Sequence, residues 1–474
     1  MNYMNHYLSR RSFIAKTAMA GGAMLLSNSV LGKVSLAKPN ERVNLACVGI
    51  GNRAAEIIKE LYKTGLCNIV ALCDVDMGAK QTLEIQKMFP DVPRFQDFRK
   101  LFDTMGNQID AVSIATPDFA HFAVAMMAMD LGKHVYVEKP LARTFFENEL
   151  LMQKARKFPT VVTQMGNQGH SEANYFQFKS WHEAGIIKNV TRIDAHMNLA
   201  RRWHGWDPNI KNFPPQEPTP ATLDWEIWQM QTWGHNYNKD FVNGQWRCWF
   251  DFGMGALGDW GAHILDTAHE FLALGLPTKV EALFLEGHNS FFFPMSSTLK
   301  FHFPKRRSMP AVEINWYDGL DNLPPIPNGY GVSGLDPNIP PPSTGEIEPA
   351  KLNPGKIIYS KNLTFKGGSH GSTLQIIPED KAEDMAGKLP EVPTSPSNHF
   401  ENFLKACKGE EKTRSPFEIS APLSQVFCLG VIAQRLNARF DFDPVKKEVV
   451  NNSFANALLV GPPPVKGWEQ FYKV

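Results

Sequence analysis

The stretch VNLACVGIGNRA, residues 43–54, decides the fold expected for this chain. Its first six residues are mainly apolar and predict a buried parallel strand. Gly49, Gly51 and Ala54 then form the pattern G-x-G-x-x-A at the start of a predicted helix over 53–63. Glycine allows a tight turn and lets backbone N–H groups approach a pyrophosphate at the helix N-terminus. The order of strand, glycine turn and helix therefore predicts a dinucleotide-binding unit.

Asp74 strengthens this prediction and indicates which dinucleotide binds. It follows a second predicted strand, 69–73, and stands 20 residues after Ala54. A carboxylate at that place accepts hydrogen bonds from the adenosine ribose diol and repels a 2′-phosphate, which favours NAD over NADP. The alternative is an aspartate that caps a helix in an α/β fold without a nucleotide.

Strands and helices continue to alternate as far as residue 164. We expect a short extended pair at Arg94-Phe95, strands at 111–115, 134–137 and 160–164, and helices at 78–88, 97–104, 119–131 and 144–157. Such alternation predicts a doubly wound parallel sheet, whose ligands bind beyond the carboxyl ends of the strands. This topology places Gly51, Asp74, Thr116-Pro117 and Lys139 around one crevice.

The second half of the chain loses this alternation. The sequence predicts helices and then a mainly antiparallel sheet, with strands at 190–197, 278–287, 296–304, 310–317, 356–366 and 372–376 and helices at 171–184, 223–228, 399–407 and 418–437. The fold class is an α/β N-terminal Rossmann domain followed by an α+β C-terminal domain with a mainly antiparallel sheet. The predicted divisions are an export signal (1–37), a Rossmann domain (38–165), a substrate and oligomerisation domain (166–460) and a C-terminal strap (461–474).

The N-terminus has the layout of an export signal. Arg10 and Arg11 precede Phe13-Ile14 and an apolar run over 15–26, which resembles a twin-arginine signal with cleavage after Ala37. An ordinary secretion signal or a disordered basic start is the alternative. The expected location is the periplasm, with no attachment to the membrane, because no other segment has about 18 uninterrupted apolar residues.

Composition limits the remaining classes of function. The 474 residues suit two domains, and 43% apolar with 20% charged residues is typical of a globular protein. A formal net charge of +1 gives no reason to expect nucleic acid as a partner. The six cysteines are spaced neither as a disulfide framework nor as a zinc site, so no metal is expected.

Four motifs together resemble the Gfo/Idh/MocA oxidoreductase family over residues 43–460. They are the glycine turn, T-P-x-x-x-H at 116–121, E-K-P at 138–140 and GALGDWGAHILD at 255–266. The resemblance implies that Lys139, Asp259 and His263 surround the hydroxyl to be oxidised and that Pro140 is a cis-proline. It also implies a homo-oligomer, a dimer or tetramer, formed by the antiparallel sheet. The expected cofactor-binding residues are Gly49, Gly51, Asn52, Arg53, Asp74, Thr116, Pro117, His121, Glu138 and Gln168.

Helical spacing gives the last motif a meaning of its own. Asp259 and His263 are four residues apart and share one helix face, and Asp266 can lie on the same side. A carboxylate and an imidazole projected together suit proton transfer from an alcohol. The alternative is an aspartate at a helix start and a hydrogen-bonded histidine in the core.

Tryptophan is concentrated in the segment that leads to this helix. Eight of the 11 tryptophans lie between 203 and 260. Aromatic faces bind the C–H faces of sugars, so we expect a carbohydrate substrate contacted by Arg247, Trp249, Trp246 and Asp266. The alternative is that most of these rings pack a long insertion and that Arg247 pairs with Asp251. A proline-rich stretch, 318–354, is predicted to be a lid or an interface arm.

Three functions follow from these features. The leading hypothesis is an exported NAD-dependent dehydrogenase acting on a sugar or glycoside hydroxyl. The second is an NAD-dependent glycoside hydrolase that oxidises a sugar hydroxyl, eliminates the aglycone and reduces the sugar again, so that NAD is recycled. The third is a sugar-binding or scaffold protein without catalysis. A purified protein that binds no NAD would favour the third.

Overall fold

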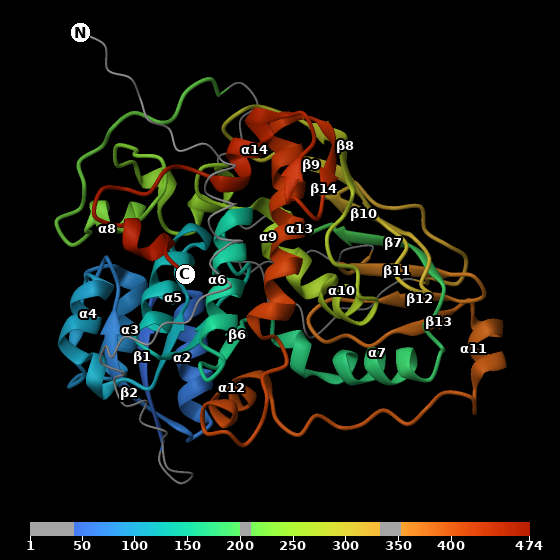
Figure 1. Cartoon of the computed structure of the whole chain (residues 1–474), viewed down its shortest axis with the longest axis horizontal. Coiled ribbons are helices and arrows are strands. Elements are labelled where there is room, and N and C mark those ends of the chain that lie inside the picture. Colours follow the sequence, from blue (N-terminus) through green and yellow to red (C-terminus); the bar gives the residue numbers. More distant parts are fainter. Residues whose placement is uncertain (1–41, 200–209, 332–351) are drawn as a thin grey trace, which may run out of the picture. The chain divides into compact units, whose positions relative to one another are not determined.

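The computed structural model describes residues 42–199, 210–331 and 352–474 (Figure 1). The predicted export signal, 1–37, lies outside these residues. Six parallel strands form the first sheet, in the order β3-β2-β1-β4-β5-β6. This order confirms the doubly wound sheet. The strands are β1 (Val43–Val48), β2 (Cys67–Cys73), β3 (Arg94–Phe95), β4 (Ala111–Ile114), β5 (His134–Val137) and β6 (Thr163–Met165).

Strand β1 lies between β2 and β4 inside the sheet, and both of its faces are buried. Leu45 and Cys47 enter a core with the helix that follows, whereas Ala46 and Val48 enter the core on the opposite face. This division follows from the period of two in a strand. The helices of this domain are α2 (Arg53–Lys63), α3 (Leu83–Met88), α4 (Phe98–Met105), α5 (His121–Asp130) and α6 (Phe145–Lys157), with 3₁₀ turns η1 (Lys80–Thr82), η2 (Gly106–Gln108) and η3 (Asp118–Ala120).

A second sheet of nine strands forms the C-terminal domain. Its order is β13-β12-β11-β7-β10-β9-β8-β14-β15, and only β7 and β10 pair in parallel. The prediction of a mainly antiparallel sheet is therefore confirmed. The strands are β7 (Val190–Met197), β8 (Lys279–Glu286), β9 (Ser296–Phe303), β10 (Val312–Asp318), β11 (Gly355–Ser360), β12 (Thr364–Gly367), β13 (Gln375–Ile377), β14 (Arg439–Asp443) and β15 (Glu448–Val449).

One predicted strand, 356–366, is instead the hairpin of β11 and β12. The chain turns between Ser360 and Leu363, where the backbone N–H and the hydroxyl of Ser360 both donate to the carbonyl oxygen of Leu363. The helices of this domain are α7 (Ala173–Glu183), α8 (Trp225–Gln229), α9 (Gly255–Ile264), α10 (Asp266–Phe271), α11 (Glu379–Met385), α12 (His399–Cys407), α13 (Phe417–Leu436) and α14 (Ser453–Val460), with 3₁₀ turns η4 (Gln168–Ser171), η5 (Lys239–Phe241), η6 (Gln245–Cys248) and η7 (Glu469–Tyr472).

Helix α13 connects the two domains by packing against both of them. It packs against α6 of the first domain and α9 of the second, and it runs beside α6 in Figure 1. A Cβ atom at Gly430 would lie 2.4 Å from the Leu257 side chain, so α13 and α9 approach too closely for a larger residue. Alone among the described helices, α13 is long and apolar enough to cross a membrane, but most of it is buried in the protein. It is therefore a core helix.

The C-terminal segment returns to the first domain. Trp468 and Phe471 both pack against Phe98 of α4, with ring centroids 5.8 Å apart in each pair. The ammonium group of Lys154 on α6 donates to the carbonyl oxygen of Lys473. These contacts attach the C-terminal segment to α4 and α6.

Candidate functional site

The glycine turn after β1 leaves the start of α2 open to an anion. Gly49 has φ +83°, and a Cβ atom there would lie 2.5 Å from the carbonyl oxygen of Ala115, so only glycine fits. Asn52 precedes the helix with φ 49° and makes no side-chain cap. The first N–H groups of α2 are thus not capped by a side chain, as binding of a pyrophosphate requires.

Asp74 follows β2 and lies beside this turn. Its carboxylate accepts hydrogen bonds from the N–H groups of Ile50 (3.0 Å) and Asp76 (3.1 Å). Burial raises the pKa of the Asp74 carboxyl to about 6 against these two bonds. The carboxylate is therefore negative at neutral pH. The uncapped helix and this carboxylate fit the pyrophosphate and the ribose of NAD.

His121 connects two loops of the crevice. Its ring nitrogens lie 2.9 Å from the carbonyl oxygens of Thr116 and Pro140, and burial lowers the pKa of its imidazole to about 4. The ring is therefore neutral and joins the T-P segment to the E-K-P segment. The buried Oγ1 of Thr116 has no hydrogen-bond partner among the described residues. Within T-P-x-x-x-H, then, His121 shapes the crevice, and the structure shows no direct role for it toward the cofactor.

Glu138, Arg53 and Gln168 also meet in this crevice. The Gln168 amide donates to the Glu138 carboxylate over 3.3 Å. Burial raises the pKa of the Glu138 carboxyl, although the charge of Arg53 opposes this shift. Three residues predicted to bind the cofactor thus come from α2, the end of β5 and η4.

Lys139 and Asp259 form an ion pair across the two domains. The peptide bond from Lys139 to Pro140 is cis, as the resemblance implied. The Lys139 ammonium donates to the Asp259 carboxylate over 2.7 Å and to the Asp259 carbonyl oxygen over 2.6 Å. His263 lies one turn farther along α9. The structure therefore brings together the residues expected to surround a reacting hydroxyl.

Arg247 belongs to the same cluster. Its Nε atom lies 3.9 Å from the Asp259 carboxylate, and its guanidinium lies over the Trp246 ring at 4.1 Å. The alternative pairing of Arg247 with Asp251 is wrong. Asp251 instead binds His235 (3.1 Å) and Arg435 (2.9 Å).

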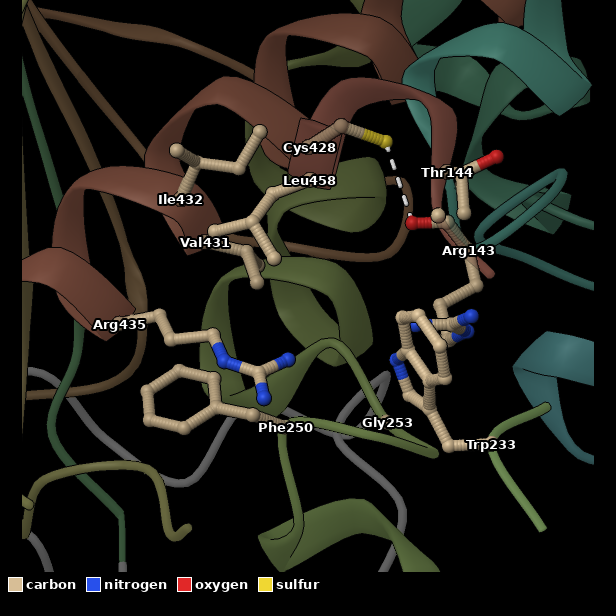
Figure 2. A pocket seen from close by; sticks show the side chains of 11 residues that line it. Arg143, Thr144, Trp233, Phe250, Gly253, Cys428, Val431, Ile432, Arg435 and Leu458 are labelled. Carbon is tan, nitrogen blue, oxygen red and sulfur yellow. Dashed lines mark hydrogen bonds between the residues drawn. The ribbon is translucent and has the colours of Figure 1, made fainter. Parts of the chain in front are cut away.

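A pocket lies beside Arg435, which pairs with Asp251, and Lys139 does not line it. Figure 2 shows Arg435 extended over the ring of Phe250, with Arg143 and Trp233 on the other side of the opening. Lys139, Asp259 and His263 are not among the residues that line it. The pocket therefore belongs to the packing of α13 against the segment before α9.

Asp118 is a site residue that the sequence reasoning missed. It begins η3, and its carboxyl is buried near Arg247, Asp259 and Lys139. Burial, together with the charge of Asp259, raises its pKa to about 7, while Arg247 and Lys139 oppose the rise. Its position directly after Thr116-Pro117, at the carboxyl end of β4, is the signal that could have found it.

Trp249 does not face the site as expected. Its ring is 2% exposed and lies 4.0 Å from Phe292 and 5.4 Å from Phe213, and its N–H donates to the carbonyl oxygen of Asp240. Its place in this aromatic core corrects its assignment as a substrate contact. Trp246 is also buried, beneath Arg247. Trp203 and Trp206 lie outside the described residues.

Asp266 lies just beyond the helix that carries His263. Helix α9 ends at Ile264, and Asp266 begins α10. Its carboxylate lies 3.1 Å from one ring nitrogen of His170, and the Glu270 carboxylate lies 2.5 Å from the other. Burial opposes charge on His170, but these carboxylates raise its pKa to about 9. Asp266 therefore lies in a buried cluster with His170 and Glu270, and its contact with a substrate stays a prediction.

No group of three histidine, cysteine, aspartate or glutamate side chains in the described ranges could hold a metal ion. All six cysteines are free thiols. The groups left for chemistry are an ammonium, carboxylates and an imidazole, which can bind a hydroxyl oxygen and move its proton.

The two domains match models of known families. Residues 43–165 match the oxidoreductase family NAD-binding Rossmann fold, and residues 186–284 match the oxidoreductase family C-terminal α/β domain. The first domain is thus an NAD-binding Rossmann domain.

Similar proteins include sugar-related enzymes. The chain is 31% identical to a glycosyl hydrolase family 109 protein of Solibacter usitatus, over 40% of this chain and 46% of the relative. It is 24% identical to inositol 2-dehydrogenase of Salmonella typhimurium, over 41% and 54%. The match spans about half the length of each relative.

Solved structures share the fold over almost the whole chain. The WlbA dehydrogenase of Chromobacterium violaceum, in complex with NADH and UDP-GlcNAcA, aligns with a TM-score of 0.57 at 15% identity. That alignment covers 89% of this chain and 99% of the other. At this identity the likeness concerns the fold alone.

Proposed function

We propose that this chain, a member of the Gfo/Idh/MocA oxidoreductase family, oxidises a hydroxyl group of a sugar or glycoside with NAD. The observation that carries the proposal is the Lys139–Asp259 ion pair, one helical turn from His263 and at the carboxyl edge of the NAD-binding sheet. Lysine, carboxylate and imidazole together provide the groups that an alcohol oxidation requires.

NAD⁺ supplies the acceptor for the hydride that leaves the carbinol carbon. The N-terminus of α2 and Asp74 would hold its pyrophosphate and adenosine ribose. Lys139 donates a hydrogen bond to the hydroxyl oxygen and stabilises the negative charge that develops there. His263 accepts the hydroxyl proton, and Asp259 holds Lys139 in place.

The similar proteins support a carbohydrate substrate. The names inositol 2-dehydrogenase and glycosyl hydrolase family 109 protein refer to a polyol and to glycosides. Arg247 is the described side chain best placed to bind further hydroxyl groups, because it lies beside Asp259 and is 25% exposed. Its guanidinium offers five donors in a fixed plane.

A second candidate is a glycoside hydrolase that recycles NAD. Three of the similar proteins carry the name glycosyl hydrolase family 109 protein, at 31–32% identity. In this reaction a ring hydroxyl is oxidised to a ketone, and the acidified neighbouring C–H loses its proton. The aglycone then leaves with the C–O electron pair, water adds, and the hydride returns to the carbonyl carbon. NAD shows no net change.

One experiment separates these two candidates. Purified protein is incubated with NAD and a panel of free sugars and nitrophenyl glycosides, and both NADH and nitrophenol are recorded. Net oxidation predicts NADH in proportion to the product, with no nitrophenol. Nitrophenol without NADH supports the recycling reaction. Neither signal, from protein that also binds no NAD, contradicts both and favours a binding protein.

We also propose that the protein is exported by the twin-arginine route and forms a homo-oligomer. Replacement of Arg10 and Arg11 by lysine should retain the protein in the cytoplasm, which cell fractionation would show. Light scattering on the mature protein should give a dimer or tetramer. A monomeric mass, or export that is unchanged in the double variant, would contradict these proposals.

A further inference from the structure

The loop between β12 and β13 brings a second histidine to the predicted base. His370 lies in this loop and has φ 51°, a left-handed conformation that is costly for a residue with a side chain. Its backbone N–H donates to the carbonyl oxygen of His263 over 3.1 Å. A strained backbone that is bonded to the catalytic helix is the kind of feature that a functional constraint maintains.

The two imidazole rings lie face to face. Their centroids are 3.8 Å apart, and their planes differ by 18°. The ring centroids of Trp260 and His370 are 5.3 Å apart, and the two ring planes meet at 83°. The Ser369 hydroxyl lies 2.8 Å from the Nδ1 atom of His370. The plane of the His370 ring is thus set by contacts on several sides.

The loop is also held from behind. A Cβ atom at Gly169 would lie 2.9 Å from the backbone of His370 and Gly371, and one at Gly371 would lie 2.0 Å from the Glu172 carboxylate. The buried ammonium of Lys356 donates to the carbonyl oxygen of Gly368. The loop therefore has little room to move away from α9.

We propose that His370 is a positioning residue that fixes the plane of the His263 imidazole, and this inference rests on the proposed function of His263 as proton acceptor. A histidine that accepts a proton must present one ring nitrogen along the O–H direction. A parallel ring against its face restricts rotation of His263 and leaves both ring nitrogens at the edges. His370 thus acts through His263 and requires no contact with the reacting atoms.

The test begins with a variant that keeps the backbone. His370→Asn removes the ring, and asparagine tolerates a left-handed φ. His370→Phe keeps an aromatic face but has no ring nitrogen. The exposed Gln375→Ala on β13 serves as the control for a change in the same hairpin. Thermal melting establishes that each full-length protein is folded.

The first readout is the NMR signal of the His263 ring, assigned with His263→Asn. We expect a single signal shifted by the stacked ring in the wild type. His370→Asn should move or broaden this signal, and His370→Phe and Gln375→Ala should not broaden it. An unchanged His263 signal in His370→Asn overturns the inference, whatever the enzyme turns over.

The second readout is turnover of a carbohydrate that the wild type oxidises. His370→Asn should lower kcat about 10- to 100-fold with little change in KM, since misplacement of a catalytic group acts on the chemical step. His370→Phe should keep most of the wild-type kcat, because it retains the stacked aromatic ring. Equal losses in both variants overturn the positioning role. If the wild type oxidises no carbohydrate while the NMR pattern is as expected, the proposed function fails and the positioning of His263 stands.

Discussion

Two polar clusters include residues of the same 12-residue motif, 255–266, one at Asp259 and the other at Asp266. The lysine cluster consists of Lys139, Asp118, Arg247 and Asp259, and the histidine cluster consists of His170, Asp266 and Glu270. The lysine cluster joins two carboxyl groups to two cations, and the histidine cluster joins two carboxylates to one histidine. The side chains of Lys139 and Arg247 are 12% and 25% exposed, whereas those of His170 and Asp266 are each 1% exposed and only Glu270 of that cluster, at 18%, reaches the surface.

The difference shows how access to solvent separates chemistry from stability. A cluster that a substrate can reach can exchange a proton with it, whereas a sealed ion pair only holds its elements together. Here the histidine cluster ties η4 to α10, and the lysine cluster ties the E-K-P segment to α9. Asp259 lies in α9 and Asp266 begins α10 seven residues later, so their carboxylates reach different clusters.

The largest expected effect is on turnover through Lys139. Lys139→Met removes the donor to the hydroxyl oxygen, and we expect kcat for any oxidised sugar to fall about 1,000-fold. The exposed Lys157→Met on α6 is the control and should keep full turnover. Steady-state kinetics of NADH formation checks the result. Full turnover of Lys139→Met on every sugar that the wild type oxidises would exclude Lys139 from the reaction.

The next effect concerns stability and the histidine cluster. Asp266→Asn removes one carboxylate from a buried charged histidine, which should lower the free energy of unfolding by about 3 kcal/mol. Turnover of the folded variant should stay close to that of the wild type. Urea unfolding followed by tryptophan fluorescence measures the change. Glu270→Gln should lower the free energy of unfolding by less, because the Glu270 carboxylate is 18% exposed. A variant of full stability without turnover would place Asp266 in the reaction.

Much of this comparison could be predicted from the sequence, because the relevant signals are local. The glycine turn and the alternation of strands and helices each depend on neighbouring residues, and the resemblance to the family implied the cis-proline. The i, i+4 spacing of Asp259 and His263 likewise describes one helix face correctly. The topology of the family then implies the order of the parallel strands and the contact between Lys139 and Asp259.

The remaining features depend on contacts between distant parts of the chain. His170 and His370 come from η4 and from a loop between strands, and no spacing connects them to 255–266. The end of α9 has neither glycine nor proline to mark it. Trp249 lies in an aromatic core with Phe213 and Phe292, which composition alone does not distinguish from a sugar-binding face.

The pH dependence of stability should reveal the charged state of the histidine cluster. The pKa of His170 is raised from 6.5 to about 9, against burial, by its bonds to Asp266 and Glu270. Between these two pH values the folded state holds a proton on His170 that the unfolded state has lost. The stability that His170 adds to the folded state is therefore complete below pH 6.5 and is lost as pH rises through about 9. His170→Gln should flatten this part of the pH profile of urea unfolding. An equally steep fall in the variant would assign it to other groups.

The smallest effect should come from Asp118 in the lysine cluster. Mainly through burial, its pKa is raised from 3.8 to about 7, so the folded state again binds the extra proton. Its favourable contribution is complete below pH 3.8 and is lost as pH rises through about 7. Asp118→Asn, which stays neutral, should therefore raise the melting temperature relative to the wild type at pH 8 but not at pH 4. We expect a gain of about 2 °C, because Arg247 and Lys139 offset part of the cost of the charge. The exposed Asp91→Asn should show no such dependence on pH. A gain of the same size at both pH values would mean that the Asp118 carboxyl does not ionise in this range, and that the lysine cluster holds one negative charge fewer than its geometry indicates.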